Sequence, residues 1–271
     1  MDLISSILLG LLQGITEFLP VSSSGHLVLA RALLNQDLSP GITFEIVVHF
    51  GSFCSIALYY RQRLTEILSN LFRSLTPSGL SSGRWKNDPD TRLCWIILLS
   101  MIPAMAIGFT LKDVIEGLFM NPVFVSFMLL VTGTLLFSTR FIGQPTGEVT
   151  ATRGLLMGIA QACAIIPGIS RAGSTIVTGL YSGINRDSVA NFSFIMVLPV
   201  LAGAMLLEII DLQDAGLDAA AIGALTAGFL TSFLSGFLAL SYLIRLLKRE
   251  KFHLFSWYCW AVGIFGIVWF W

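Results

Sequence analysis

The sequence predicts an all-α polytopic membrane protein built as an inverted-topology repeat, with two re-entrant helix pairs and about six transmembrane helices. Two observations lead to this fold class. First, 55% of the 271 residues are hydrophobic and only 12% are charged, which leaves too little polar surface for a water-soluble globule. Second, residues 10–26 and 158–174 repeat one pattern of glycine, proline and serine inside apolar sequence. Such repeats are typical of membrane proteins whose binding site lies at the repeat interface.

The internal repeat is visible when the second segment is shifted onto the first. Four pairs of identical residues then coincide: Gly10 with Gly158, Gln13 with Gln161, Ser22 with Ser170, and Gly25 with Gly173. Phe44 and Phe192 match at the same offset further along. We therefore expect one membrane domain over residues 1–271, with a first repeat at about 1–138 and a second at about 154–271.

Apolar stretches long enough to cross ~30 Å of hydrocarbon define the spans. They cover residues 42–60, 93–111, 122–138, 188–210, 219–243 and 254–271.

The loop between the first two spans carries six basic residues, from Arg61 to Arg92, which places it in the cytoplasm by the positive-inside rule. For the crossings to alternate, residues 154–187 must enter and leave from the cytoplasmic side, and residues 1–35 from the outer side. Irregular backbone at membrane depth is tolerated only inside protein or beside a water-filled cavity. Both breaks are therefore predicted to meet near the middle of the bilayer.

Composition also excludes some classes of function. The formal net charge is zero, which argues against a nucleic-acid partner because phosphate binding needs a basic face. The four cysteines lie in apolar segments at unrelated spacings, so neither a metal motif nor a disulfide framework is expected. The chain opens directly into an apolar helix without a basic region, so no removable signal peptide is expected.

Three ionisable residues lie within the breaks, where lipid would make them costly, and they are therefore candidates for function. Glu17 and His26 belong to the first break and Arg171 to the second. Arg171 has a planar fork suited to bidentate phosphate contact, and His26 can attack phosphorus or transfer a proton near neutral pH. Glu17 can orient His26, hold a divalent cation or act as a base. A purely structural alternative is an ion pair between Glu17 and Arg171 that only locks the repeats together.

Hydroxyl groups and backbone N–H groups beside helix N-termini accompany these three residues, and such groups cradle phosphate oxygens. They belong to Ser22, Ser23, Ser24 and Gly25 in the first break, and to Ser170, Gly173, Ser174 and Thr175 in the second. A carboxylate, an imidazole and a guanidinium around such donors predict a phosphoryl-transfer site.

Other polar positions leave two interpretations open. Glu45 and His49 are four residues apart on one helix face, so they form either a second layer of the site or satisfied interhelical hydrogen bonds. Gln13 and Gln161 either contact the ligand or tie backbone across the pseudo-twofold axis. The aromatic residues near the C-terminus are expected to form membrane-interface belts; they are Trp257, Tyr258, Trp260, Trp269 and Trp271.

The two motifs QGITEFLPVSSSGH and PGISRAGS resemble the signature motifs of the bacterial undecaprenyl-diphosphate phosphatases of the bacitracin-resistance type. The resemblance covers essentially the whole chain and includes the segments FEIVVHFGS and NFSFIMVLP. It implies removal of the terminal phosphate of undecaprenyl diphosphate, which recycles the lipid carrier for peptidoglycan synthesis and confers bacitracin resistance. It also implies a divalent cation, Mg²⁺ or Ca²⁺, in a multi-pass protein of the bacterial inner membrane.

Carried over position by position, the resemblance assigns catalytic roles to Glu17, Ser23, His26 and Arg171, with the cation near Glu17. Gln13 stands where the family often has a first glutamate, so a two-carboxylate metal or base arrangement is in doubt here. We expect the diphosphate to enter from the outer leaflet, on the periplasmic side, while the prenyl tail stays in lipid. Either His26 or Ser23 performs the chemistry, and His26 is preferred because an unassisted serine is a weak nucleophile.

Two other functions are compatible with parts of the pattern. Inverted repeats with broken helices also build secondary transporters, so a transporter or flippase of a lipid phosphate is the main alternative. A type-2 phosphatidic-acid phosphatase would need a Lys-to-Arg-Pro motif and a second catalytic His followed by Asp, and neither appears. Small residues such as Gly223, Gly228 and Gly236 would allow close helix contacts within one chain or in a homodimer, and the pattern does not choose between them.

Overall fold

The computed structural model describes residues 3–34, 42–76, 78, 88–211, 219–248 and 250–271. Over these residues the regular structure is helical, apart from one isolated bridge between Gly147 and Ile184. The helices are α1 (Leu3–Phe18), α2 (Ser23–Leu33), α3 (Ile42–Tyr59), α4 (Arg61–Ser74), α7 (Pro89–Thr110), α8 (Lys112–Phe119), α9 (Pro122–Ser138), α10 (Ala151–Cys163), α11 (Arg171–Tyr181), α12 (Arg186–Asp211), α13 (Ala219–Lys248) and α14 (Phe255–Phe270), with short 3-10 turns at Thr139–Phe141 and Phe252–Leu254.

Local signals in the sequence set several helix starts. Asp88 caps α7 by accepting a hydrogen bond from the Thr91 backbone N–H at 2.7 Å, and Asn121 caps α9 through the Phe124 N–H at 3.0 Å. In both helices proline occupies the first turn, where its missing N–H costs nothing. The Asp88 cap explains why α7 begins before its apolar stretch, whereas α9 begins where its stretch does.

Each predicted span coincides with a helix, which confirms the polytopic all-α fold. Among the described residues, four segments are long and apolar enough to cross a membrane by themselves: Pro89–Thr110, Pro122–Phe141, Ala221–Leu247 and Phe252–Phe270. The apolar part of α3 is shorter, and α12 supplies the remaining predicted span with Pro199 inside it. The sidedness of these helices stays a prediction.

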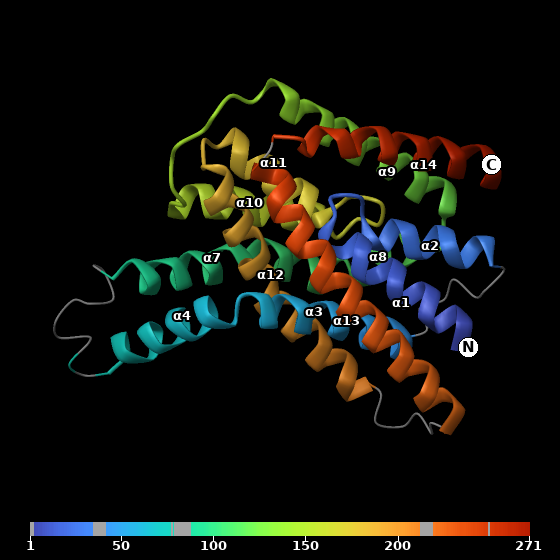
Figure 1. The fold of residues 1–271 in the computed structure, drawn as a ribbon, viewed down its shortest axis with the longest axis horizontal. Helices are drawn as coiled ribbons and strands as arrows, with labels where there is room; N and C mark the ends of the chain where they lie inside the picture. Colours follow the sequence, from blue (N-terminus) through green and yellow to red (C-terminus); the bar gives the residue numbers. More distant parts are fainter. Residues whose placement is uncertain (1–2, 35–41, 77, 79–87, 212–218, 249) are drawn as a thin grey trace.

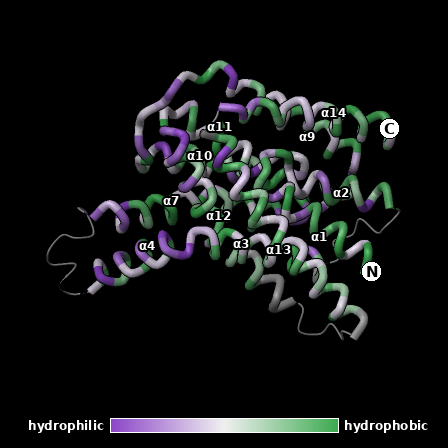
Figure 2. Tube along the Cα trace, in the orientation of Figure 1, coloured by the Kyte–Doolittle hydropathy of each residue, from purple (hydrophilic) through white to green (hydrophobic). Residues whose placement is uncertain are grey.

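The basic segment after α3 is not the plain loop that the sequence suggested, because its first half forms α4. Polar residues gather on this helix, whereas α1 and α14 are mainly hydrophobic (Figure 2). Helices α4 and α7 lie side by side (Figure 1), and Arg63 of α4 forms an ion pair with Asp90 of α7. Asn70 donates a further hydrogen bond to Asp90 at 2.8 Å. These polar contacts with α7 help to hold α4 in place, and a search for apolar stretches does not detect such contacts.

The two halves of the chain are packed into each other. Helix α1 of the first half packs along α13 of the second, and α10 of the second half packs along α7 of the first. Helices α3 and α12 contact each other, and α9 lies along α14 (Figure 1). Such reciprocal packing, in which a helix of each half lies against a helix of the other, is expected for two halves related by a pseudo-twofold axis. The short hairpins α1–α2 and α10–α11 confirm the predicted helix pairs on either side of each break.

Small residues let these helices approach closely within one chain. A Cβ atom at Gly228 would lie 2.7 Å from the Phe44 ring, and one at Gly236 would lie 2.7 Å from the Phe18 ring. Gly223 has no such neighbour within 4 Å. Gly228 and Gly236 therefore serve packing inside the monomer, which was one of the two alternatives for these glycines.

Replacing Gly14 with valine should destabilise the fold, because a Cβ atom there would overlap the Ser235 hydroxyl and the Ser232 carbonyl oxygen of α13. Overpacking of this kind costs about 1–3 kcal/mol. Gly108→Val is the matched control, since no atom lies within 4 Å of a Cβ atom at that helical glycine. Thermal unfolding in detergent micelles should show a lower midpoint for Gly14→Val than for Gly108→Val. Equal midpoints would contradict the close α1–α13 contact.

Candidate active site

The two breaks have the same local construction. Ser22 caps α2 by accepting a hydrogen bond from the Gly25 N–H at 3.2 Å, and Ser170 caps α11 by accepting one from the Gly173 N–H at 3.0 Å. Ser22 adopts φ 71°, a left-handed conformation that is uncommon for a residue with a side chain. Matching residues of the repeat therefore play matching roles, and the glycine N–H groups expected to face phosphate are used by the caps.

Backbone groups of the second break are satisfied by protein, as membrane depth requires. The Thr132 hydroxyl of α9 donates to the Gly168 carbonyl at 2.8 Å and accepts from the Ser170 N–H at 3.0 Å. Gly168 has φ +93°, and a Cβ atom at Gly25 would lie 3.1 Å from the Cα atom of Gly168. The two breaks are therefore in direct contact, which confirms the prediction that they meet.

Glu17 is the centre of the polar cluster at this junction. Its Oε1 accepts a hydrogen bond from Arg171 Nη2 at 2.7 Å, and its Oε2 accepts from Ser23 Oγ at 2.7 Å and from Gln13 Nε2 at 3.0 Å. His49 Nδ1 lies 2.9 Å from Gln13 Nε2 and 3.9 Å from Glu17 Oε2. A carboxylate, a hydroxyl and a guanidinium from both halves of the chain thus meet in one buried place.

His26 lies on α2 close to this cluster in sequence but has different partners. Its Nδ1 is 2.7 Å from the Ser22 carbonyl oxygen, and its Nε2 is 2.9 Å from the Tyr258 hydroxyl. The alternative in which Glu17 orients His26 is therefore wrong, because Glu17 accepts from Ser23 instead. Tyr258, which the sequence assigned to an interface belt, contacts this candidate catalytic residue. The sequence around Tyr258 is rich in tryptophan, and nothing in it distinguishes a tyrosine at the membrane interface from one that contacts His26.

Of the two interpretations left open for Glu45, the structure shows the interhelical contact. Glu45 Oε1 forms an ion pair with Arg31 Nη1 at 2.7 Å, which satisfies both charges between α3 and α2. His49 joins the Glu17 cluster through Gln13 instead. The helical spacing put both residues on one face, but it carried no information about Arg31.

Several of the predicted phosphate ligands have structural partners. The Thr175 hydroxyl is fully buried, donates to the Arg171 carbonyl at 2.9 Å and lies 2.6 Å from the Ser193 hydroxyl of α12. The Thr175 hydroxyl therefore connects α11 to α12. We had expected it to bind substrate, but in the structure it is used for this contact between helices. Ser24 lies 3.3 Å from the hydroxyl of Ser22, and Ser174 is buried in the first turn of α11.

Four buried polar atoms at or near the breaks have no hydrogen-bond partner among the described residues. They are Gln13 Oε1, Arg171 Nη1, and both Nε2 and Oε1 of Gln161. Neither glutamine therefore ties backbone across the pseudo-twofold axis. Buried polar groups are normally satisfied, so unpaired atoms beside Glu17 indicate a site that receives a polar ligand.

The donor set is limited for a metal ion bound by protein alone. In the described part of the chain, no group of three or more His, Cys, Asp and Glu side chains is placed to hold one. Mg²⁺ commonly uses one or two protein oxygens together with substrate phosphates. Glu17 has about four lone-pair positions of which three are used, and Gln13 Oε1 is unpaired, so these residues fit a cation that the substrate helps to hold.

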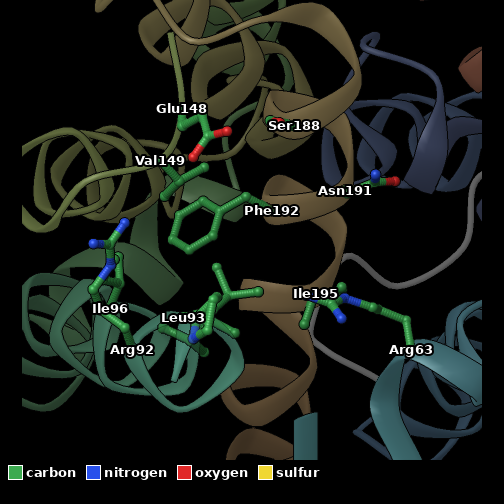
Figure 3. A pocket seen from close by; sticks show the side chains of 12 residues that line it. Arg63, Arg92, Leu93, Ile96, Glu148, Val149, Ser188, Asn191, Phe192 and Ile195 are labelled. Carbon is green, nitrogen blue, oxygen red and sulfur yellow. The ribbon is translucent and has the colours of Figure 1, made fainter. Parts of the chain in front are cut away.

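A separate pocket of about 260 Å³ lies where α4, α7 and α12 meet (Figure 3). Arg63, Arg92 and Glu148 line it together with apolar residues of α7 and α12. No residue of either break contributes to it. It is therefore distinct from the Glu17 cluster, and its mixed charges give no clear chemistry.

Fold and site together define a polytopic membrane protein with one polar centre, formed where two broken helical hairpins touch. Comparison with known families agrees. The family model described as "Bacitracin resistance protein BacA" matches residues 6–265, so the chain belongs to this family.

Relatives of this chain carry one common name. A protein of Desulforapulum autotrophicum named undecaprenyl-diphosphatase is 39% identical, over 99% of this chain and 98% of the relative. A protein of the same name from Salinibacter ruber is 37% identical over 97% of each chain. Another, from Methanosphaera stadtmanae, is 36% identical over 99% of this chain and 98% of the relative.

Proposed function

We propose that the protein is an undecaprenyl-diphosphate phosphatase, a membrane hydrolase that yields undecaprenyl phosphate and inorganic phosphate. The observation that carries the proposal is that Arg171 and Ser23 each donate a hydrogen bond to Glu17 at 2.7 Å. The name shared by the relatives supports it. In this function the protein returns the lipid carrier to peptidoglycan synthesis, and faster recycling of the carrier accounts for bacitracin resistance.

Three contacts favour Ser23 over His26 as the group that attacks phosphorus, which reverses the preference drawn from the sequence. The Ser23 hydroxyl donates to Glu17 at 2.7 Å, so this serine is assisted by a base. Both ring nitrogens of His26 have other partners. An activated nucleophile next to a positioned base is the recurring arrangement of covalent catalysis.

In the first step, Ser23 Oγ attacks the terminal phosphorus while its proton passes to Glu17 Oε2. The bond between that phosphorus and the bridging oxygen breaks, undecaprenyl phosphate leaves, and a phosphoserine remains. Arg171 neutralises the charge on the equatorial oxygens of the transferring group; its unpaired Nη1 is available for that contact.

In the second step, water attacks the phosphoserine and its proton passes to His26. Ser23 regains the proton that Glu17 holds, and inorganic phosphate is released. His26 is three residues from Ser23 on α2, and this spacing places both side chains on one face of the helix. His26 is therefore placed on the same face of α2 as Ser23, where it can receive this proton.

A divalent cation, Mg²⁺ or Ca²⁺, is part of the proposal. Glu17 and the unpaired amide oxygen of Gln13 would hold it together with phosphate oxygens of the substrate. When bound, such a cation stabilises negative charge on the transferring phosphate. Gln13 in this role explains a buried oxygen without a partner.

The location within the cell is a further part of the proposal. The chain is a multi-pass membrane protein, and we place it in the bacterial inner membrane with the site open to the periplasmic side. The basic residues of α4 and the segment after it support a cytoplasmic position for that end. The zero net charge gives no support to a nucleic-acid partner. A homodimer remains compatible with the exposed apolar faces.

The test is phosphate release by purified protein from undecaprenyl diphosphate in detergent micelles with Mg²⁺. We expect release of one inorganic phosphate per lipid, and loss of activity on removal of the cation with a chelator. A transporter or flippase of a lipid phosphate would move its cargo in vesicles without releasing phosphate in micelles. Absence of release by folded protein would therefore refute the phosphatase and favour that alternative.

A further inference from the structure

Tyr258 of α14 contacts His26 of α2 across 232 positions of the chain. The Tyr258 hydroxyl lies 2.9 Å from His26 Nε2, and the two rings are parallel within 4°, with centroids 5.5 Å apart. We propose that Tyr258 is a positioning residue that fixes the imidazole of His26 and makes Nε2 its proton-transferring nitrogen. The inference rests on the proposed function, because it concerns the proton transfer assigned there to His26.

The other ring nitrogen shows which one can exchange a proton. Nδ1 of His26 lies 2.7 Å from the carbonyl oxygen of Ser22, and a carbonyl oxygen can only accept a hydrogen bond. Nδ1 therefore keeps its hydrogen in both protonation states of the ring. In the neutral imidazole the lone pair must then be on Nε2, which is the atom that faces Tyr258.

A tyrosine hydroxyl is suited to a nitrogen that changes its protonation. It donates its hydrogen to neutral Nε2, and it accepts a hydrogen bond when Nε2 is protonated. A carbonyl or a carboxylate at this place would favour one state only. His26 is only 6% exposed, so water cannot readily replace a lost partner and the cost of an unpaired nitrogen would be felt. The phenol can thus bond Nε2 both before and after the proton transfer, and it leaves the lone pair to the incoming proton during the transfer.

Helix α14 holds Tyr258 against the first break through its neighbours. Cys259 is fully buried with its Sγ 3.9 Å from the Pro20 carbonyl oxygen. Trp260 donates its indole N–H to the Leu130 carbonyl of α9 at 3.3 Å. Tyr258 itself is 45% exposed, whereas His26 is buried. This placement gives the last helix of the fold a direct part in the site.

Tyr258→Phe tests the inference because it removes the hydroxyl and keeps the ring. We expect kcat to fall about tenfold to a hundredfold, the range found for hydrogen-bond partners behind metal-bound histidines, while KM changes by less than about twofold. Tyr242→Phe is the matched control, since Tyr242 lies on α13 with 55% of its surface exposed; it should leave both constants unchanged. An unchanged kcat in Tyr258→Phe would overturn the inference.

Two further measurements separate positioning from a merely structural role. In a His26→Ala background, Tyr258→Phe should cause no additional loss of the residual activity, because Tyr258 acts only through His26; an equal loss in both backgrounds would overturn the inference. In protein with ¹⁵N-labelled histidines, the Nε2 resonance of His26 should shift in Tyr258→Phe and not in Tyr242→Phe. The resonance can be measured without substrate, so its failure to shift is distinct from a wild-type protein that releases no phosphate.

Discussion

Ser23→Ala is expected to reduce phosphate release from undecaprenyl diphosphate by about a thousandfold or more, as removal of a nucleophile does in comparable enzymes. The reason is the hydrogen bond from the Ser23 hydroxyl to Glu17, which provides the attacking oxygen together with its base. Release of phosphate at constant substrate concentration, measured in micelles, gives the rate. Near-normal activity would show that water or His26 attacks phosphorus instead.

The control for this variant is Ser241→Ala on α13, where the serine hydroxyl only donates to its own helix at 2.8 Å. It should retain full activity. Rapid acid quenching with a substrate labelled in its terminal phosphate adds a direct readout, because wild-type protein should carry the label on Ser23. No label on the protein, together with full loss of activity in Ser23→Ala, would assign Ser23 to substrate binding rather than attack.

Variants of the Glu17–Arg171 pair are expected to have the second large effect. Arg171→Ala leaves a buried carboxylate, 8% exposed, without its partner, and breaking a buried pair in this way costs about 3–5 kcal/mol of stability. Arg171→Lys keeps the charge but loses the planar fork, so we expect folded protein with kcat/KM lower by about a hundredfold. Arg63→Lys on α4 is the control and should remain active.

The double variant Glu17→Gln with Arg171→Gln separates catalysis from a structural lock. Because no unpaired charge is left buried, its unfolding midpoint should be higher than that of Arg171→Ala. Its activity should nevertheless be lost, since both the base and the phosphate clamp are gone. If the pair only joined the two repeats, a stable double variant would release phosphate at a normal rate.

The spans and the breaks could be predicted because their causes are local in the sequence. Apolar length defines a membrane helix, and each break brings proline, glycine and serine together in one short stretch, which disfavours a continuous helix. Helix α4 was missed because its apolar residues are few, and its position depends on polar contacts with Asp90 of α7. Membrane sidedness rests on charge alone and stays a prediction.

The composition of the site was predictable only in part. Glu17, Ser23 and Arg171 stood out as polar residues in apolar surroundings, and the structure brings these three together. Their partners depended on contacts between distant segments. Tyr258 is 232 positions from His26, and Glu45 pairs with Arg31 of another helix, a contact that its spacing from His49 did not reveal. No pattern within a helix carries such information.

The two hairpins share one shape but have diverged in chemistry. When the repeats are aligned with Gly10 on Gly158, Glu17 corresponds to Ile165 and Ser23 corresponds to Arg171. A duplicated ancestor with identical halves would have offered two equivalent half-sites on its symmetry axis. In this chain the carboxylate of Glu17 and the hydroxyl of Ser23 belong to the first copy and the guanidinium of Arg171 to the second, so the two copies form a single asymmetric centre. The hairpin of each half also packs against a helix of the other half, α1 on α13 and α10 on α7. The fold and the site therefore both require the two halves.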